Sequence, residues 1–181
     1  MPRIGVTDGV RGERTWNSTR RKARKGYNNT YLDVPGGWQI GGSAAAGVLG
    51  TAESVVAFPN AAASAIYMTI RKRSMWVAGG ELQVTIFYSG NTSSTATIDL
   101  TLGASERTLG DNIAAAHSLT QLDSIAGPAS QPALLSHTFS SNLTVGGGGE
   151  YLSLAISRDA TDNYGGICYI TGVDLKYLSR N

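Results

Sequence analysis

Apolar and polar residues alternate along most of the chain after residue 38. The clearest runs are residues 65–72, 82–89, 95–102 and 151–158, and in 95–102 every polar residue falls on one side of the pleat. A period of two places successive side chains on opposite faces of a strand, so each run predicts a β-strand with one buried face. The threonine-rich outer face of 95–102 favours an antiparallel sheet.

The alternating segments predict an all-β fold, an antiparallel, jelly-roll-like β-sandwich of about eight strands. The predicted strands are residues 38–40, 54–58, 65–72, 82–89, 95–102, 134–145, 151–158 and 167–178. No helix of the length needed for a βαβ unit separates them, which argues against a parallel sheet.

Turn-forming residues predict the connections between these strands. Residues 89–94 join two alternating runs through Ser, Gly and Asn, so we expect a hairpin there. Residues 111–117 are the one passage where a short helix is plausible, with Asp111 as its cap. Gly172 falls within the last predicted strand and predicts a bulge or bend.

Residues 1–34 show neither helical nor strand periodicity, and 35–37 (Pro-Gly-Gly) break regular structure. We therefore predict two parts: a basic, extended N-terminal arm over residues 1–35 and a β-sandwich domain over residues 36–181. Charge follows the same division. Residues 1–25 hold eight of the fifteen Lys and Arg but only two of the thirteen acids, so this segment carries +6 and the rest of the chain −4.

A basic, polar arm ahead of an acidic domain predicts a negatively charged partner. The predicted partner-binding residues of the arm are Arg11, Arg14, Trp16, Arg20, Arg21, Lys22, Arg24, Lys25, Tyr27 and Tyr31. These side chains suit an acidic protein surface, through Arg–carboxylate pairs and aromatic anchors. They equally suit nucleic acid, through phosphate neutralisation and base stacking. The predominance of Arg favours protein, and a merely solubilising tail is the third possibility.

The chain has few residues of the types that usually carry out catalysis. It has two histidines, His117 and His137, and the lone Cys168, which falls in an apolar run and is expected to be buried. No Gly-x-Ser-x-Gly turn occurs, and the four glycines at 146–149 precede Glu150, so they do not match a phosphate loop. We expect no enzyme, no cofactor and no metal. The acids at 159–163 resemble a calcium loop only faintly, and a plain polar hairpin loop accounts for them.

Two surface features of the domain remain open. The cluster 71–73 (Arg-Lys-Arg) ends a predicted strand, which is typical of a solvated strand end that discourages edge-to-edge pairing. The second feature is a set of aromatic residues. They either belong to the core or line a sugar-binding face. They are Trp76, Tyr88, Tyr151, Tyr164 and Tyr169.

Two segments carry a resemblance to a known class of proteins. Residues 76–89 and 151–177 resemble the β-sandwich domains of tailed-phage virion structural proteins. In the second segment a strand ends in Arg158-Asp159, a Tyr164-Gly165 turn follows, and the last strand reads Gly172-Val173-x-Leu175-x-Tyr177. This pattern is similar to that of capsid decoration (cement) proteins and head-fibre domains.

The resemblance implies a non-enzymatic, homotrimeric virion protein, made in the host cytoplasm and located on the capsid surface. Its arm would bind the major capsid protein or another virion protein and so stabilise the capsid lattice. The alternative is a fibre-tip or carbohydrate-binding receptor-recognition module, with the aromatics and loops near residues 76 and 159–166 contacting glycans. Nucleic-acid binding through the arm is a second alternative. No apolar run is long enough to span a bilayer, so we expect no membrane partner.

Overall fold

A computed structural model describes residues 25–33, 37–49, 53–72, 80–112, 115–130, 133–139, 143–145 and 149–180. These residues form twelve β-strands and no helix. The strands are β1 (Lys25–Asp33), β2 (Gln39–Gly42), β3 (Ala45–Leu49), β4 (Glu53–Phe58), β5 (Ser64–Arg71), β6 (Gly80–Gly90), β7 (Thr97–Arg107), β8 (Leu119–Ala126), β9 (Leu135–Thr138), β10 (Leu143–Val145), β11 (Tyr151–Arg158) and β12 (Cys168–Arg180). The described part of the chain contains no helix long and apolar enough to cross a membrane.

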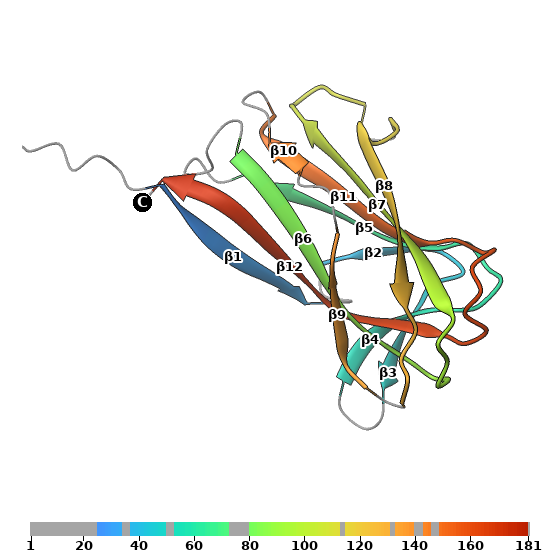
Figure 1. The fold of residues 1–181 in the computed structure, drawn as a ribbon. Helices are drawn as coiled ribbons and strands as arrows, with labels where there is room; N and C mark the ends of the chain where they lie inside the picture. Colours follow the sequence, from blue (N-terminus) through green and yellow to red (C-terminus); the bar gives the residue numbers. More distant parts are fainter. Residues whose placement is uncertain are drawn as a thin grey trace, which may run out of the picture.

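The strands form two antiparallel sheets that pack face to face as a β-sandwich (Figure 1). The five-stranded sheet has the order β2-β5-β11-β7-β8. The seven-stranded sheet has the order β10-β6-β12-β4-β3, with β1 also paired to β12 and β9 to β6. The predicted all-β sandwich is therefore confirmed.

Alternation places the core between the two sheets. Leu82, Val84 and Ile86 of β6 are fully buried against the other sheet, and Leu154 and Ile156 of β11 face them from the opposite side. Their polar neighbours along each strand lie on the outer faces, as a period of two requires. Burying each such aliphatic side chain contributes about 1.5–3 kcal/mol, so these inward rows hold the two sheets together.

The long strand β12 lies between several neighbours and changes them along its length. Its residues 168–170 pair with β4 on one side, and its residues 172–180 pair with β1 there instead. On its other side its residues 168–177 pair with β6, with a register shift between Ile170 and Gly172. The bulge predicted at Gly172 is confirmed. It bends the strand so that β1 and the second half of β12 extend beyond the five-stranded sheet (Figure 1).

Strand β1 corrects one expectation about the arm. Residues 25–33 show no alternating pattern, yet their backbone pairs with β12 from Lys25↔Arg180 to Asp33↔Gly172. A strand without an alternating pattern forms because β12 offers an otherwise unpaired edge there. The predicted division at residue 35 otherwise stays a prediction, since residues 1–24 lie outside the described residues.

Several predicted local features are wrong. Residues 89–94 and 159–167 do not close hairpins, because β6 and β12 belong to the seven-stranded sheet while β7 and β11 belong to the other. Both segments cross between the sheets. Around residues 111–117 the described residues form a turn without a helix, and Asp111 accepts a hydrogen bond from the Thr108 amide there.

The strand count is also higher than predicted. The run 134–145 is two short strands, β9 and β10, that pair with different parts of β6. They are separated because Phe139 leaves the strand and enters the core, where it is 1% exposed. Strands β3 and β8 were not predicted, because their sequences are rich in Ala and Gly or in mixed polar residues.

Candidate functional site

The outer face of the five-stranded sheet carries in-register rows of polar side chains. Tyr151 at the start of β11 is paired with Arg71 of β5 on one side and with Arg107 of β7 on the other. Paired residues of an antiparallel sheet project from the same face, so the two guanidinium groups flank the tyrosine. Two positions further along β11, Ser153 pairs with Thr69 and Ser105 and forms a row of hydroxyls.

This face is hollowed into a pocket of about 250 Å3, here called the sheet-face pocket. Its lining residues are Thr69, Arg107, Thr108, Leu109, Gly110, Asp111, Tyr151 and Ser153. The strands supply the floor. The turn that follows β7 supplies a wall, on which Leu109 is 77% exposed.

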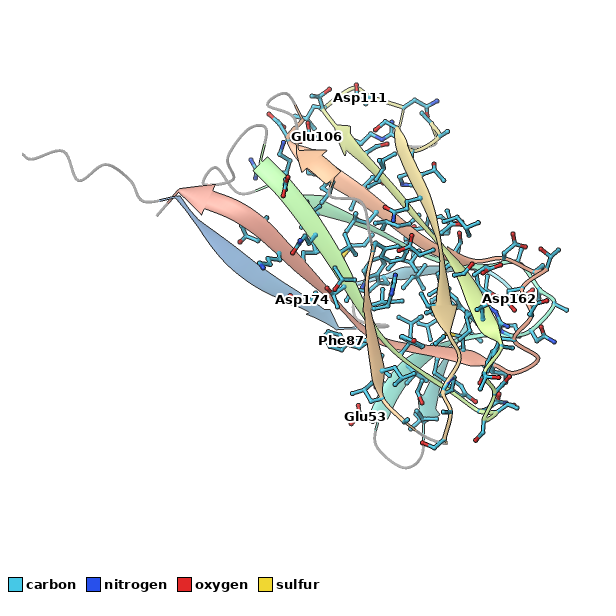
Figure 2. All side chains as sticks on the ribbon, in the orientation of Figure 1. Glu53, Phe87, Glu106, Asp111, Asp162 and Asp174 are labelled. Atoms are coloured by element: carbon cyan, nitrogen blue, oxygen red, sulfur yellow. The ribbon has the colours of Figure 1, made fainter. Side chains whose placement is uncertain are left out.

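Hydrogen bonds fix the turn that forms this wall. The Thr108 amide donates to Asp111 Oδ2 at 2.6 Å, and the Asp111 amide donates back to the Thr108 carbonyl at 3.1 Å. The backbone donor of Thr108 lowers the pKa of the Asp111 carboxyl, and the nearby Arg107 guanidinium lowers it further. Asp111 is therefore ionised at neutral pH and caps the turn at the rim of the pocket, at the upper edge of the view in Figure 2.

Arg107 connects the wall to the sheet. Its Nη2 donates to the carbonyl oxygens of Ala115 at 2.6 Å and Ala116 at 3.3 Å. Its Nε is buried and has no hydrogen-bond partner. None of the ion pairs among the described residues includes Arg107, so no carboxylate neutralises its charge directly.

His117 packs on the same face beside the pocket. Its ring lies against the backbone of Gly103, where a Cβ would come within 2.9 Å of Nδ1. Its Nε2 is 3.4 Å from the Ser153 hydroxyl. Burial, and then the neighbouring Arg107, lower the pKa of His117, so the imidazole is neutral at pH 7. No carboxylate among the described residues bonds this imidazole, so a Ser-His-Asp arrangement is not formed there.

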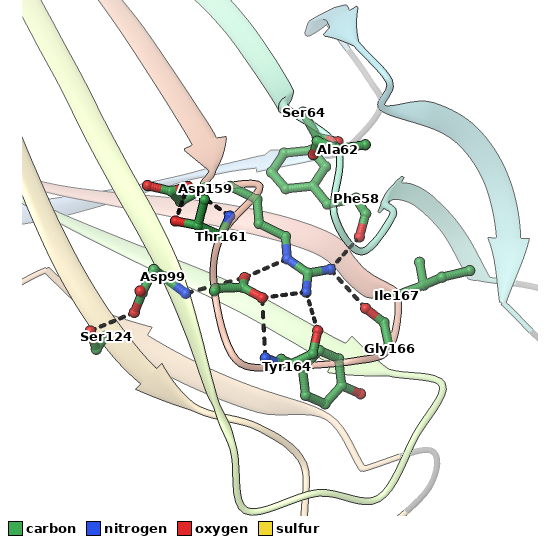
Figure 3. A network of polar contacts seen from close by, with 12 residues as sticks. Phe58, Ala62, Ser64, Asp99, Ser124, Asp159, Thr161, Tyr164, Gly166 and Ile167 are labelled. Atoms are coloured by element: carbon green, nitrogen blue, oxygen red, sulfur yellow. Dashed lines mark hydrogen bonds and ion pairs between the residues drawn. The ribbon is translucent and has the colours of Figure 1, made fainter.

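The opposite end of β11 has a different polar cluster (Figure 3). Arg158 is 2% exposed and uses all five of its N–H donors. Two go to the Asp162 carboxylate, at 2.6 and 2.7 Å. The other three go to the carbonyl oxygens of Phe58, Gly166 and Tyr164, at 2.6 to 2.8 Å. This cluster holds the segment that crosses from β11 to β12.

The acidic side chains of that crossing segment, Asp159 and Asp162, are bonded to other groups of the protein. Asp159 accepts hydrogen bonds from the amide and hydroxyl of Thr161, and the amide in particular lowers the pKa of its carboxyl. Asp162 is paired with Arg158 and also accepts from the Tyr164 amide. Among the described residues no group of three or more His, Cys, Asp or Glu is arranged to hold a metal ion. These contacts stabilise the crossing segment, which therefore offers few free groups to a glycan.

The structure sorts the aromatic residues of the domain. Tyr88 and Tyr164 are buried in the core, at 3% and 0% exposure, whereas Tyr151 lines the pocket and Tyr169 is half-buried. Trp76 lies outside the described residues. Tyr67, 44% exposed on the pocket face, was missed as a site residue, although its place in an alternating strand predicted that it faces outward.

The described residues of the basic cluster 71–73 lie on opposite faces of the sheet. Arg71 is exposed on the pocket face, while Lys72 points the other way and pairs with Glu106. Arg73 lies outside the described residues. Cys168 is buried, as predicted, and burial raises the pKa of its thiol to about 12, so it is not a reactive thiolate at neutral pH.

The predicted arm site cannot be assembled from the described residues. Its positions 11–24 lie outside them, and Lys25, Tyr27 and Tyr31 belong to β1. Capsid binding through the arm, trimer formation and a place in the virion therefore stay predictions.

Comparisons with known proteins bear on the fold. No protein-family model matches the chain, and no curated protein matches it in sequence. Among solved structures, the CBM35 of Cellvibrio japonicus Abf62 is similar over 85% of this chain and 99% of that chain, with a TM-score of 0.52 and 14% identity. The exo-beta-1,3-galactanase of Phanerochaete chrysosporium, solved with galactose, has a TM-score of 0.53 and 12% identity over 82% of this chain.

Only 29% of the galactanase chain is matched, so this chain spans less than a third of that enzyme. Tailspike protein 4 of bacteriophage CBA120 is also similar, at 14% identity over 83% of this chain and 19% of its own, but its TM-score is 0.42. Structural neighbours thus include a carbohydrate-binding module and a phage tailspike domain. At these identities the first two likenesses show a shared β-sandwich, and the third carries no argument.

Proposed function

We propose that this chain is a non-catalytic carbohydrate-binding module whose site is the sheet-face pocket. One observation supports the proposal above the others. Tyr151 projects from the sheet between two arginines, directly beside the hydroxyl row of Thr69 and Ser153, in a pocket that the strand register builds.

The chemistry of this arrangement suits a sugar. A pyranose has an apolar face of C–H groups that packs on an aromatic ring, and an edge of hydroxyls that needs donors and acceptors. Tyr151 offers the ring. Thr69 and Ser153 offer groups that both donate and accept, and His117 stands beside Ser153 as a neutral imidazole with the same capacity.

The dimensions and rigidity of the pocket agree with this ligand class. A volume of about 250 Å3 lies just below the usual range of ligand pockets, about 300–1,000 Å3, and suits a single sugar unit of a longer chain. The floor residues sit on paired strands, so their backbones are already fixed before the ligand arrives. A preorganised floor reduces the entropy lost on binding.

Tyr67 extends the site along β5. It projects from the same face as Thr69 and is 44% exposed, and its ring lies over Gly41, where a Cβ would come within 2.7 Å of Cε2. A second exposed aromatic on the same face provides a position for a neighbouring sugar unit. The overall likeness to a CBM35, over nearly the full length of that module, supports the same function.

A saccharide array probed with the full chain tests the proposal. We expect binding to at least one saccharide class, and we expect Tyr151→Ala to weaken it by about tenfold or more, equivalent to about 1.4 kcal/mol. Tyr169→Ala is the matched control, because it removes a half-buried tyrosine from β12 in the other sheet. Urea unfolding of both variants checks that they remain folded.

Two results would reject this function. One is a folded chain that binds no saccharide at all. The other is a Tyr151→Ala variant that binds as tightly as the unchanged chain.

A further inference from the structure

We infer that the sheet-face pocket selects an acidic saccharide, one whose sugar carries a carboxylate. This inference rests on the proposed function and adds the ligand class. It starts from the row of residues paired with Tyr151. This row contains two arginines, although the domain as a whole is slightly acidic.

Two arginines belong to the row of paired residues that contains Tyr151. Arg107 lines the pocket, and Arg71 stands two strands away in the same row, with Tyr151 between them. At about 4.8 Å per strand, the backbones of the two arginines are roughly 10 Å apart, so a sugar ring held over Tyr151 would lie between the two residues.

Neither positive charge has an ion-pair partner among the described residues. The ion pairs among the described residues are Lys72–Glu106, His137–Asp123 and Arg158–Asp162, and neither arginine of the row takes part. Arg107 bonds only carbonyl oxygens through Nη2, and its buried Nε has no acceptor. A charge held by neutral partners in a partly dry site keeps its attraction for an anion.

One acid, Asp111, lines the pocket and partly offsets the charge of Arg107, whereas Glu106 and Glu150 do not line it. Glu106 faces the inside of the sheet and is paired with Lys72 at 2.5 Å. Asp111 stands at the exposed rim, where its carboxylate holds the Thr108 amide. Glu150, directly before Tyr151, is exposed and lies outside the pocket lining. His117 adds no charge at neutral pH, so the row of residues paired with Tyr151 carries two cations, against the one carboxylate of Asp111 at the rim.

A carboxylate is the anion that fits these groups best. Guanidinium groups form short, directional, charge-assisted bonds with carboxylates, about twice as strong as bonds between neutral partners. A sugar acid keeps the ring that packs on Tyr151 and adds one anion at its edge. The pocket is too small, and its charged groups too few, for the repeated phosphate contacts of nucleic acid.

Affinity measurements with matched saccharide pairs test the inference. The full chain is titrated with neutral oligosaccharides and with their uronate counterparts in the gluco, galacto and manno series, and with a sulfated saccharide and single-stranded DNA. We expect at least one uronate to bind about tenfold more tightly than its neutral partner, and this preference to shrink as salt is raised.

Arg71→Gln is the main variant, because this side chain is exposed and takes part in no ion pair among the described residues. We expect it to reduce the acid-to-neutral affinity ratio several-fold. Arg107→Gln has the same expected effect, with its folding checked separately since Arg107 also holds the 115–116 backbone. Lys176→Gln, on the other sheet, removes the same charge and should leave the ratio unchanged.

The outcomes separate the two proposals. Equal affinity for acidic and neutral partners, with the ratio unmoved by Arg71→Gln, overturns the inference and keeps the carbohydrate-binding function. Preference for the sulfated saccharide or for DNA over every uronate also overturns it. Absence of binding to any saccharide rejects the proposed function itself.

Discussion

Two arginines lie near the two ends of β11 and differ in how their donors are used. Arg158, at the C-terminal end, is buried and spends all five N–H donors on one carboxylate and three carbonyl oxygens. Arg107, paired with Tyr151 at the N-terminal end, has no carboxylate partner and a buried Nε without an acceptor. The same kind of side chain is fully bonded within the protein in one place and lacks a carboxylate partner in the other.

The difference shows how to separate a structural charge from a binding charge. A buried charge is tolerated when it is paired and its donors are satisfied, as in the network of Figure 3. A charge beside a pocket that has no carboxylate partner adds little to stability, and it can attract an anionic ligand. Four predictions test this comparison, from the largest expected effect to the smallest.

Arg158→Met should give the largest loss of stability. It removes one partner of a buried ion pair and leaves the Asp162 carboxylate buried with an uncompensated charge. We expect the free energy of unfolding, measured with urea, to fall by about 3–5 kcal/mol. Adding Asp162→Asn should recover part of the loss, because it removes the stranded charge. A loss below about 1 kcal/mol would contradict the structural role of Arg158.

Gly103→Ala should produce an intermediate effect at the pocket end. The new Cβ would lie 2.9 to 3.0 Å from atoms of the His117 ring, which must shift. Such overpacking costs about 1–3 kcal/mol, and the shift also disturbs the side of the pocket, so saccharide affinity should fall as well. Gly165→Ala, in the crossing segment at the other end, is the control. A Cβ there meets nothing within 4 Å, and stability should change by less than about 0.5 kcal/mol.

Arg107→Gln should cost far less stability than Arg158→Met. It removes two hydrogen bonds to carbonyl oxygens, which contribute about 1 kcal/mol in total at this half-exposed site, and it strands no opposite charge. Urea unfolding of both variants under the same conditions gives the comparison directly. Losses of equal size would show that Arg107 is a structural residue and would weaken its assignment to the pocket.

The smallest effect is a pH dependence from His117. Its pKa in the folded chain is below the ordinary value of 6.5, so the unfolded chain binds the proton more readily. Its contribution to stability is therefore complete above pH 6.5 and is lost as the pH falls through the lower, folded-state pKa. Urea unfolding at pH about 7 and about 5 should show a smaller loss for His117→Gln than for the unchanged chain.

Two carboxylates affect stability in a lower pH range than His117 does. The pKa values of Asp111 and Asp159 are lowered from 3.8, so their contributions persist until the pH falls below that value. An unchanged pH response in His117→Gln between pH about 7 and about 5 would contradict the lowered pKa of this imidazole.

Much of the strand content was predictable because burial imposes a local signal. Leu82, Val84, Ile86 and Tyr88 recur at every second position, and all four are buried in the structure. The bulge at Gly172 was predictable for the same reason, since glycine interrupts an otherwise regular pattern. These features depend on neighbours within a few residues along the chain.

The connections and the site were not predictable, because they depend on register. An alternating strand has the same pattern whether the next strand pairs beside it or crosses to the opposite sheet, so residues 89–94 predict a hairpin that does not form. Arg71, Arg107 and Tyr151 come from three strands far apart in sequence and meet only through β11. Nothing local distinguishes Arg107 from Arg158, although one lines a pocket and the other is buried.

The position of β12 has a consequence for the time course of folding. It follows every other strand in chain order, yet it pairs with β1, β4 and β6, which are otherwise incomplete on that side. During synthesis these three strands expose unpaired edges until β12 has left the ribosome. Such pairing between distant segments is slow to form, and open edges promote aggregation. Slower translation just before residue 168 would lengthen that exposure, and a chaperone that shields strand edges would be most useful then.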